Sequence, residues 1–437
     1  MIKIKQVFLI AICFTVMFVF QSSAVIMEEQ RYDLEELLDK NIEGDSIKLL
    51  ELENKLSKVQ YETNIKDYED FKKSIGETEQ RIVDINNNMK VARHQYNIAT
   101  GEASKSMWSA AMVSIYNNFS AARTSYRLRV KQYINVIKSV EPAIFAKENA
   151  DKQKEEDIKK AQLSLKNDYY NHYILTKEIE MMKKDIENLY KQIEIEKVKE
   201  SLGMTTDLTL YEVEIQKFEY DNMLYEMENR LTLATEKIKT DLEIDMSEEF
   251  EIIHELPEQD TFVEYDVEDL IDAFLENNLQ IAFSKNNIKV KELVLEKLDI
   301  AYRTKYEHAD TDEVLTEEQQ AMLETAELEV EKAKLEHEVL VKSMELFVKQ
   351  VYYEYIRTHR ELTAASLNTR RYDAKLKVER EKLIQGTISQ VAFDTQEAAI
   401  NRNLFDIEKD KISYELACDK IEMIKEGINP GQTGQST

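Results

Sequence analysis

The chain has 437 residues, of which 33% are charged, and it contains 8 Gly, 3 Pro and a formal net charge of −27. This composition argues strongly against a sheet-rich fold, which needs Gly- and Pro-containing turns every 8–12 residues or so. It also argues against a nucleic-acid partner, because phosphate binding requires a basic face. The acidic balance is compatible with a solvated surface, with basic partners, or with a lumen that favours cations.

The N-terminus has the pattern of an export signal. Lys3 and Lys5 precede an apolar run over residues 7–20, and small residues follow at positions 22–24. This pattern predicts a signal peptide over residues 1–24 and an exported protein. The run is short for a membrane-spanning helix, although an uncleaved anchor is the alternative. After cleavage, Cys418 would be the only cysteine, so no intramolecular disulfide is expected.

The opening of the mature region recurs later in the chain. Residues 32–39 read Tyr-Asp-Leu-Glu-Glu-Leu-Leu-Asp and residues 265–272 read Tyr-Asp-Val-Glu-Asp-Leu-Ile-Asp, with five of eight positions identical. Such self-similarity at a fixed offset indicates an internal structural repeat. The expected organisation is a first helical repeat over 25–243, a linker over 244–264, a second helical repeat over 265–426 and a disordered tail over 427–437.

Long helices account for most of both repeats. Apolar residues recur at steps of three or four from Trp108 to Ile137, which is one face of a helix and is expected to be helix core. A helix boundary is expected at Glu141–Pro142, because the residue before a proline disfavours helical geometry. From about 143 to 202 the pattern is helical, with a heptad seam over residues 179–193. In the linker, alternation over residues 250–252 favours a short strand.

Two glycine turns organise these helices. Gly203 and Gly386 each lie between long charged helical runs, and small hydroxylated residues follow both. Gly suits the left-handed position that ends a helix, and Ser or Thr can cap the next one. The sequence thus predicts an all-α fold of long antiparallel coiled-coil hairpins in two tandem repeats. Ten residues form the predicted hairpin tips: Leu202, Gly203, Met204, Thr205, Thr206, Gln385, Gly386, Thr387, Ile388 and Ser389.

The export signal, the repeat and the two tips together resemble the TolC / outer-membrane efflux factor family. The matching motifs are Leu202-Gly203-Met204-Thr205, residues 386–392 and the Leu-rich, Asn-containing opening over 270–279. The resemblance implies a homotrimeric helical α-barrel in the cell envelope that conducts exported solutes passively. It also implies that the tips contact a periplasmic adaptor, or membrane fusion protein, which works with an inner-membrane pump. No cofactor and no enzymatic chemistry are implied.

Two features depart from that family. Its members cross the outer membrane with strands of about ten alternating residues. The corresponding places here, about 303–320 and 104–137, lack that alternation, so we expect this part to be reduced or missing. Ala392 and Thr209 occupy the place of an aspartate ring found in some members, which argues against an acidic constriction here.

Local motifs for chemistry are absent from the sequence. The six His residues are each at least 22 positions apart, and no phosphate loop, nucleophile elbow or Cys pair occurs. We therefore expect neither an enzyme nor a metal protein. Two hypotheses remain: a trimeric conduit of an efflux or type I secretion-like system, or an exported coiled-coil scaffold that conducts nothing. The matched Gly/Thr tips favour the conduit, because a scaffold has no need of them.

Overall fold

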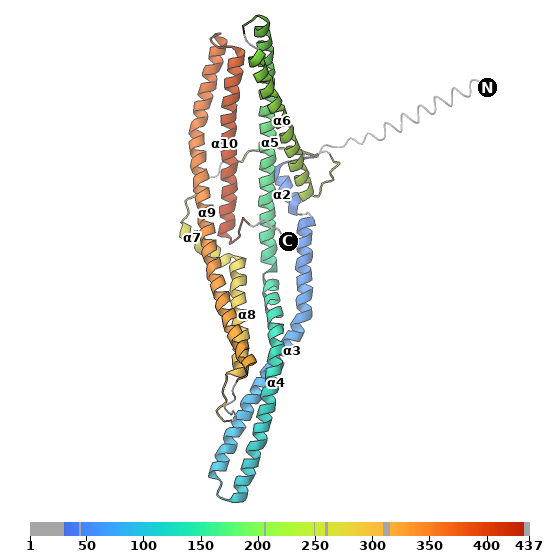
Figure 1. Ribbon diagram of the computed structural model, residues 1–437, viewed down its shortest axis with the longest axis vertical. Helices are drawn as coiled ribbons and strands as arrows, with labels where there is room; N and C mark the ends of the chain where they lie inside the picture. Colours follow the sequence, from blue (N-terminus) through green and yellow to red (C-terminus); the bar gives the residue numbers. More distant parts are fainter. Residues whose placement is uncertain are drawn as a thin grey trace, which may run out of the picture. The chain divides into compact units, whose positions relative to one another are not determined.

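The computed structural model describes residues 30–42, 45–204, 207–248, 250–257, 261–308 and 315–431. The chain divides into two compact units, each built from separate stretches (Figure 1). Unit 1 consists of Met1–Ser46, Ala161–Asp260 and Glu361–Glu415, and unit 2 of Ile47–Lys160, Thr261–Arg360 and Leu416–Thr437. Each unit contains residues from both predicted repeats, so the packing does not follow the boundary between them.

Unit 1 is built on two helical hairpins. The first joins α5 (Ala150–Ser201) to α6 (Asp207–Asp241), and the second joins α9 (Glu317–Ile384) to α10 (Gln390–Lys425). Parts of α5, α9 and α10 also belong to unit 2. The short helix α2 (Leu34–Ile42) belongs to unit 1 as well.

Polar contacts set the order of these helices as α6, α5, α10 and α9 (Figure 1). Lys183 on α5 pairs with Glu228 on α6 at 2.9 Å. Contacts that join α5 to α10 include Asp185–Arg402, Lys191–Asp394 at 3.4 Å, Lys166–Glu415 at 2.6 Å and Tyr173–Glu408 at 2.6 Å. Tyr372 on α9 donates to Asn403 on α10 at 3.1 Å. Helices α5 and α10 therefore lie in the middle, and α6 and α9 form the two edges.

A small parallel sheet completes unit 1. Strand β1 (Gln30–Tyr32) pairs with β2 (Phe250–Ile252), and Tyr32 lies opposite Ile252. Strand β2 lies where the alternating pattern of the linker predicts one. Helices make up the rest of the regular structure in the described residues, so the predicted all-α class is confirmed.

Unit 2 is organised around helix α4. Its elements are α3 (Asp45–Ile98), α4 (Glu102–Glu148), α7 (Val267–Asn277), α8 (Leu279–Tyr302), the first parts of α5 and α9 and the end of α10. Buried residues of α4 recur at helical spacing: Phe119, Ala122, Tyr126, Val130, Tyr133, Ile137 and Val140. They pack in one hydrophobic core with buried residues of α3 and α8, such as Ile82 and Leu298. Burial of these apolar faces is the main stabilising term for such helices.

The helix boundary predicted at Glu141–Pro142 is wrong. Helix α4 continues through Pro142 and ends at Glu148, followed by Asn149 in a non-helical conformation. Proline costs the helix one backbone hydrogen bond. The neighbouring side chains Ile137 and Val140 are buried in the core, and we infer that their packing outweighs that cost.

Only part of the helix core expected over residues 108–137 is buried in the structure. The face is buried from Phe119 onward, whereas Trp108 is half-buried and Tyr116 is 38% exposed. Toward the turn at Gly101 the apolar side chains of α4 therefore face solvent. Periodicity alone could not locate this change, because the same spacing continues on both sides of it.

The first residues of the predicted disordered tail are packed in unit 2. Gly427 has φ +80°, and a Cβ atom there would lie 2.5 Å from the Asn277 carbonyl carbon. The buried Asn278 side chain donates to the Gly427 carbonyl oxygen at 2.8 Å and also caps α8, accepting from Ile281 N. Residues 432–437 of the tail, like the predicted signal peptide, lie outside the described residues.

Candidate functional site

The first predicted tip ends α5 with a left-handed glycine. Gly203 has φ +71°, and its N–H donates to Glu200 O at 2.8 Å. The N–H of Met204 reaches back to Lys199 O, also at 2.8 Å. This pair of bonds satisfies the last carbonyl groups of the helix and requires a positive φ at the glycine. The predicted tip residues Thr205 and Thr206 lie outside the described residues.

The second tip repeats this geometry at the end of α9. Gly386 has φ +68° and donates to Leu383 O at 2.9 Å, and Thr387 N donates to Lys382 O at 2.9 Å. Ser389 then caps α10, because its hydroxyl accepts from Ala392 N at 3.2 Å. The glycine-plus-hydroxyl pattern read from the sequence therefore forms the turn that it predicts.

Both tips belong to unit 1 and expose apolar side chains to solvent. Leu202 and Met204 are 66% and 73% exposed, and Ile384, next to Gln385, is 80% exposed. The predicted tip residues Gln385 and Thr387 are exposed, while Ile388 is half-buried. Apolar side chains held at the ends of rigid hairpins suit contact with another protein.

The two edges of unit 1 also expose apolar residues. Helix α6 exposes them at steps of three, four or seven: Leu208, Tyr211, Ile215, Phe218 and Tyr225. The part of helix α9 that belongs to unit 1 exposes Leu367, Val378 and Ile384. A heptad stripe of apolar residues is the pattern by which one helix packs against another.

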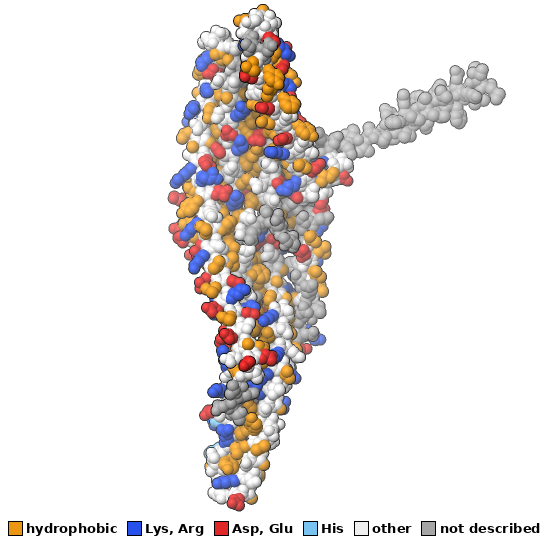
Figure 2. Space-filling model, viewed as in Figure 1, with side chains coloured by type: hydrophobic (Ala, Val, Ile, Leu, Met, Phe, Trp, Pro, Cys, Tyr) orange, Lys and Arg blue, Asp and Glu red, His pale blue; other side chains and the backbone are white. Residues whose placement is uncertain are grey.

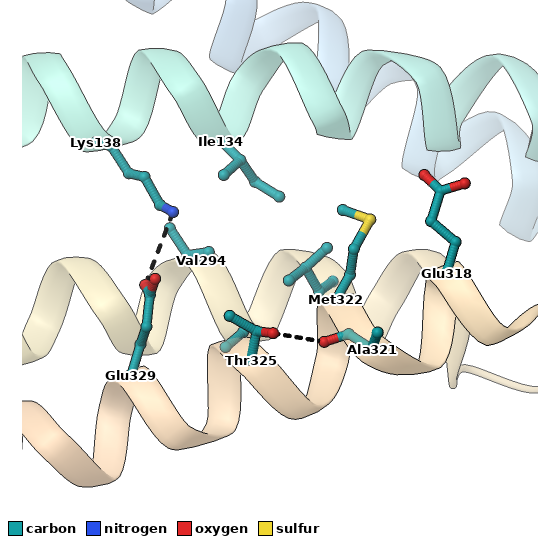
Figure 3. Close-up of a pocket in the computed structure, with 10 residues that line it drawn as sticks. Ile134, Lys138, Val294, Glu318, Ala321, Met322, Thr325 and Glu329 are labelled. Atoms are coloured by element: carbon teal, nitrogen blue, oxygen red, sulfur yellow. Dashed lines mark hydrogen bonds and ion pairs between the residues drawn. The ribbon is translucent and has the colours of Figure 1, made fainter.

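A pocket of about 330 Å³ lies in unit 2 between α4, α8 and α9 (Figure 3). Ile134 and Met322 give it an apolar lining, and Lys138 reaches Glu329 at 3.7 Å on its rim. Thr325 donates to the carbonyl oxygen of Ala321 and so offers no free donor to a ligand. The arrangement suits a small apolar group and presents no acid–base pair or nucleophile.

A second pocket of about 440 Å³ lies in unit 1 over α5, α6 and α10. Four methionines line it: Met181, Met182, Met223 and Met227. Methionine side chains adapt their shape and favour apolar contacts. Charged residues line it as well, among them Asp185 and Arg402, which pair with each other.

The linker is fastened to α5 by residues that the sequence analysis did not single out. The Tyr169 hydroxyl donates to Ile253 O at 2.9 Å and accepts from Glu255 N at 2.7 Å. Beside it, His172 lies in hydrogen-bonding contact with His254. Burial, and for His172 also the neighbouring His254, lowers the pKa of each imidazole to about 4. Nothing in the local sequence signals this contact, since the two residues are 82 positions apart.

The part of the chain that the structure describes contains no group of three or more His, Cys, Asp or Glu placed to hold a metal ion. Among its helices, none is both long and apolar enough to cross a membrane.

Solved structures similar to the chain include a membrane protein, an outer membrane protein and an outer membrane channel. A membrane protein from Pseudomonas aeruginosa has 12% identity and a TM-score of 0.49, with 69% of this chain and 73% of that chain covered. The Vibrio cholerae outer membrane protein VceC has 11% identity and a TM-score of 0.46, with 66% of this chain and 75% of that chain covered. The Campylobacter jejuni CmeC outer membrane channel has 11% identity and a TM-score of 0.46, with 81% of this chain and 87% of that chain covered. No family model and no curated protein sequence matches the chain.

Proposed function

We propose that the protein is a passive conduit of the cell envelope, in which three copies close into a helical tube. Exported by its signal peptide, it would let solutes or secreted proteins pass without covalent chemistry. Its tips would meet a periplasmic adaptor that connects the tube to an inner-membrane pump. The observation that carries this proposal is that both edge helices of unit 1 expose apolar side chains, in a heptad stripe on α6 and at Leu367, Val378 and Ile384 on α9.

These two edges call for a partner because both expose large apolar side chains to solvent. Exposed side chains such as Phe218 and Tyr225 on α6 are 66% and 68% exposed, and Leu367 on α9 is 72% exposed. Removing apolar area from water is the main term that favours association between proteins. A second copy of the chain supplies a helix for each edge.

The two edges differ, which favours a ring over a symmetric pair. If α6 of one copy packs on α9 of the next, the contact is heterologous, and heterologous contacts close into rings when the rotation permits. The direction of the chain is suitable, because α6 leaves its hairpin tip and α9 approaches its own. Helices would then alternate in direction around the whole ring. Three copies, the number implied by the family resemblance, would contribute twelve helices.

The tips support the adaptor contact. Leu202, Met204 and Ile384 lie at the ends of hairpins whose glycine turns are rigidly hydrogen-bonded. Rigid apolar groups lose little conformational entropy on binding, so they are suitable anchors for a protein partner.

Export measurements in cells test the proposal. Cells that lack the protein should retain a fluorescent efflux dye or a secreted substrate, and the native chain should restore export. A variant with Phe218→Glu and Tyr225→Glu should not restore it, because charges on the α6 edge prevent closure of the tube. The matched control, Glu219→Gln with Glu226→Gln, changes neighbouring exposed positions and should restore export. Restoration by the Phe218/Tyr225 variant would contradict the conduit, and normal export without the protein would favour the scaffold.

A further inference from the structure

The end of the α3–α4 hairpin carries a charge opposite to that of the chain as a whole. Between Asp84 and Glu141, Glu102 is the single acidic residue in the sequence, although the full chain has 85 acidic and 58 basic residues. The same stretch has eight basic residues: Lys90, Arg93, Lys105, Arg123, Arg127, Arg129, Lys131 and Lys138. Such a local reversal of charge attracts an anionic partner.

Three of these cations are available for binding. The five on the middle of α4 contact the protein itself; for example, Arg127 donates to Ala301 O at 3.1 Å and Lys131 pairs with Glu318 at 2.9 Å. Lys90, Arg93 and Lys105 lie near the turn between α3 and α4 and are exposed. Within the described ranges, none of these three forms an ion pair.

Large apolar side chains surround these cations. On α3, Val91 is 57% and Ile98 56% exposed, and on α4, Met107 is 58% and Val113 59% exposed. The rings of Tyr96, Trp108 and Tyr116 are also partly exposed at this end. Figure 2 shows orange and blue side chains close together at the hairpin end, at the bottom of the view.

The apolar face of α4 from Phe119 onward is covered within unit 2. The Phe119 ring packs edge-on against Tyr306 at 5.6 Å between centroids, and Asn86 accepts a hydrogen bond from His308 N at 3.0 Å. Beyond these contacts the apolar spacing of α4 continues toward Trp108, but the side chains become exposed. A helix face that keeps its apolar pattern where it is not buried indicates a partner of its own.

We propose that the end of the α3–α4 hairpin docks on the surface of a lipid bilayer that contains anionic lipids. Lys90, Arg93 and Lys105 would bind the headgroups, each contributing about fivefold to the partition coefficient. Trp and Tyr rings are favoured at the boundary between headgroups and acyl chains, and Ile98 and Met107 would enter it. An acidic protein would complement the charge, but it would not account for the aromatic and aliphatic side chains grouped around it. The inference does not depend on the conduit proposal, because it concerns other residues.

The single tryptophan of the chain reports directly on this contact. Trp108 lies at the hairpin end, so its fluorescence can be followed without a label. The full-length protein is mixed at low salt with phosphatidylcholine vesicles, with or without about one third phosphatidylglycerol, and with acyl chains brominated as quenchers. With anionic vesicles we expect a blue shift and quenching of Trp108 that weaken as salt is added. Neutral vesicles should cause much less of either.

Two variants make the test specific. Replacing Lys90, Arg93 and Lys105 by Gln should weaken the partition measured by Trp108 quenching at least about tenfold. Replacing the exposed residues Lys285, Lys289 and Lys377 by Gln removes the same charge elsewhere and should leave quenching unchanged. Another membrane-binding segment, such as the apolar N-terminus, could sediment the protein with vesicles but would not bring Trp108 into contact with brominated chains. The absence of Trp108 quenching with anionic vesicles at low salt, or equal quenching of the triple Gln variant, would overturn the inference.

Discussion

His172 Nδ1 lies 2.8 Å from His254 Nε2, and the surrounding bonds determine which nitrogen carries each proton. The Thr235 hydroxyl donates to Leu231 O at 2.9 Å, so it accepts from His172 Nε2–H at 3.0 Å. His172 Nδ1 is then an unprotonated acceptor, and His254 Nε2–H donates to it. His172 must be neutral for this chain of hydrogen bonds, and burial favours the neutral form of His254 as well. The chain of bonds fastens the segment after β2 to α5 and α6.

Acid should weaken unit 1 through this pair. The pKa of each imidazole in the folded protein is about 4, below the ordinary value of 6.5. The stabilisation is therefore complete above about pH 6.5 and is lost as the pH falls toward 4. For His172 the shift corresponds to about 3 kcal/mol. Urea unfolding followed by circular dichroism at pH 7.5 and pH 5 should show this loss as a lower midpoint.

His254→Gln separates this pair from other titrating groups. The glutamine amide can still donate to His172 Nδ1 but does not titrate, so we expect a smaller loss of stability between pH 7.5 and 5. His94→Gln, at an exposed position on α3, serves as the control and should keep the native dependence. An unchanged pH dependence in His254→Gln would show that other groups dominate.

Gly427 should tolerate no side chain. Gly427→Ala combines a φ of +80° with a Cβ atom 2.5 Å from Asn277 backbone, so we expect a loss of at least about 1–3 kcal/mol in the free energy of unfolding. Gly76→Ala lies within helix α3 with no atom within 4 Å of the new Cβ, and should stabilise by about 0.5–1 kcal/mol. Chemical denaturation of the two variants measures the predicted decrease and the predicted increase in the free energy of unfolding. Equal effects would mean that the packing of Gly427 against Asn277 contributes nothing.

The glycine turns at the tips can be tested separately from the helices. Gly203→Val with Gly386→Val places β-branched residues at φ near +70°, which disfavours both turns. We expect adaptor binding, measured by co-purification, to be lost while the helical signal stays intact. Gly101→Val, at a turn with φ −109°, is the control. Full binding by the double variant would remove the tips from the mechanism.

The α6 edge of one copy should pack only on the α9 edge of another copy. The α6 variant Phe218→Glu with Tyr225→Glu and the α9 variant Leu367→Glu with Val378→Glu should each fail to form a closed ring. Mixed together they retain one native α6 edge and one native α9 edge, so native mass spectrometry should detect a one-to-one pair. If the α6 and α9 edges do not pack on each other, the mixture gives no such pair, and the heterologous ring is wrong.

Local chemistry accounts for what the sequence could predict. Gly203 and Gly386 mark their turns because few other residues adopt positive φ, and helical spacing identifies α4 from Phe119 onward. Contacts between distant residues were not predictable. His172 meets His254 only after folding, and Gly427 lies in a segment whose composition suggests disorder. At Pro142 the prediction was wrong: the rule that a helix ends before a proline was outweighed by the buried packing around this residue.

The number of copies in solution tests the central proposal most directly. Light scattering on a sizing column gives the mass of the assembly independently of its shape. The proposed conduit predicts three times the mass of one mature chain, and negative-stain images of that fraction should show a hollow tube. A particle with the mass of one chain at every concentration, with no larger species, would contradict the trimeric conduit.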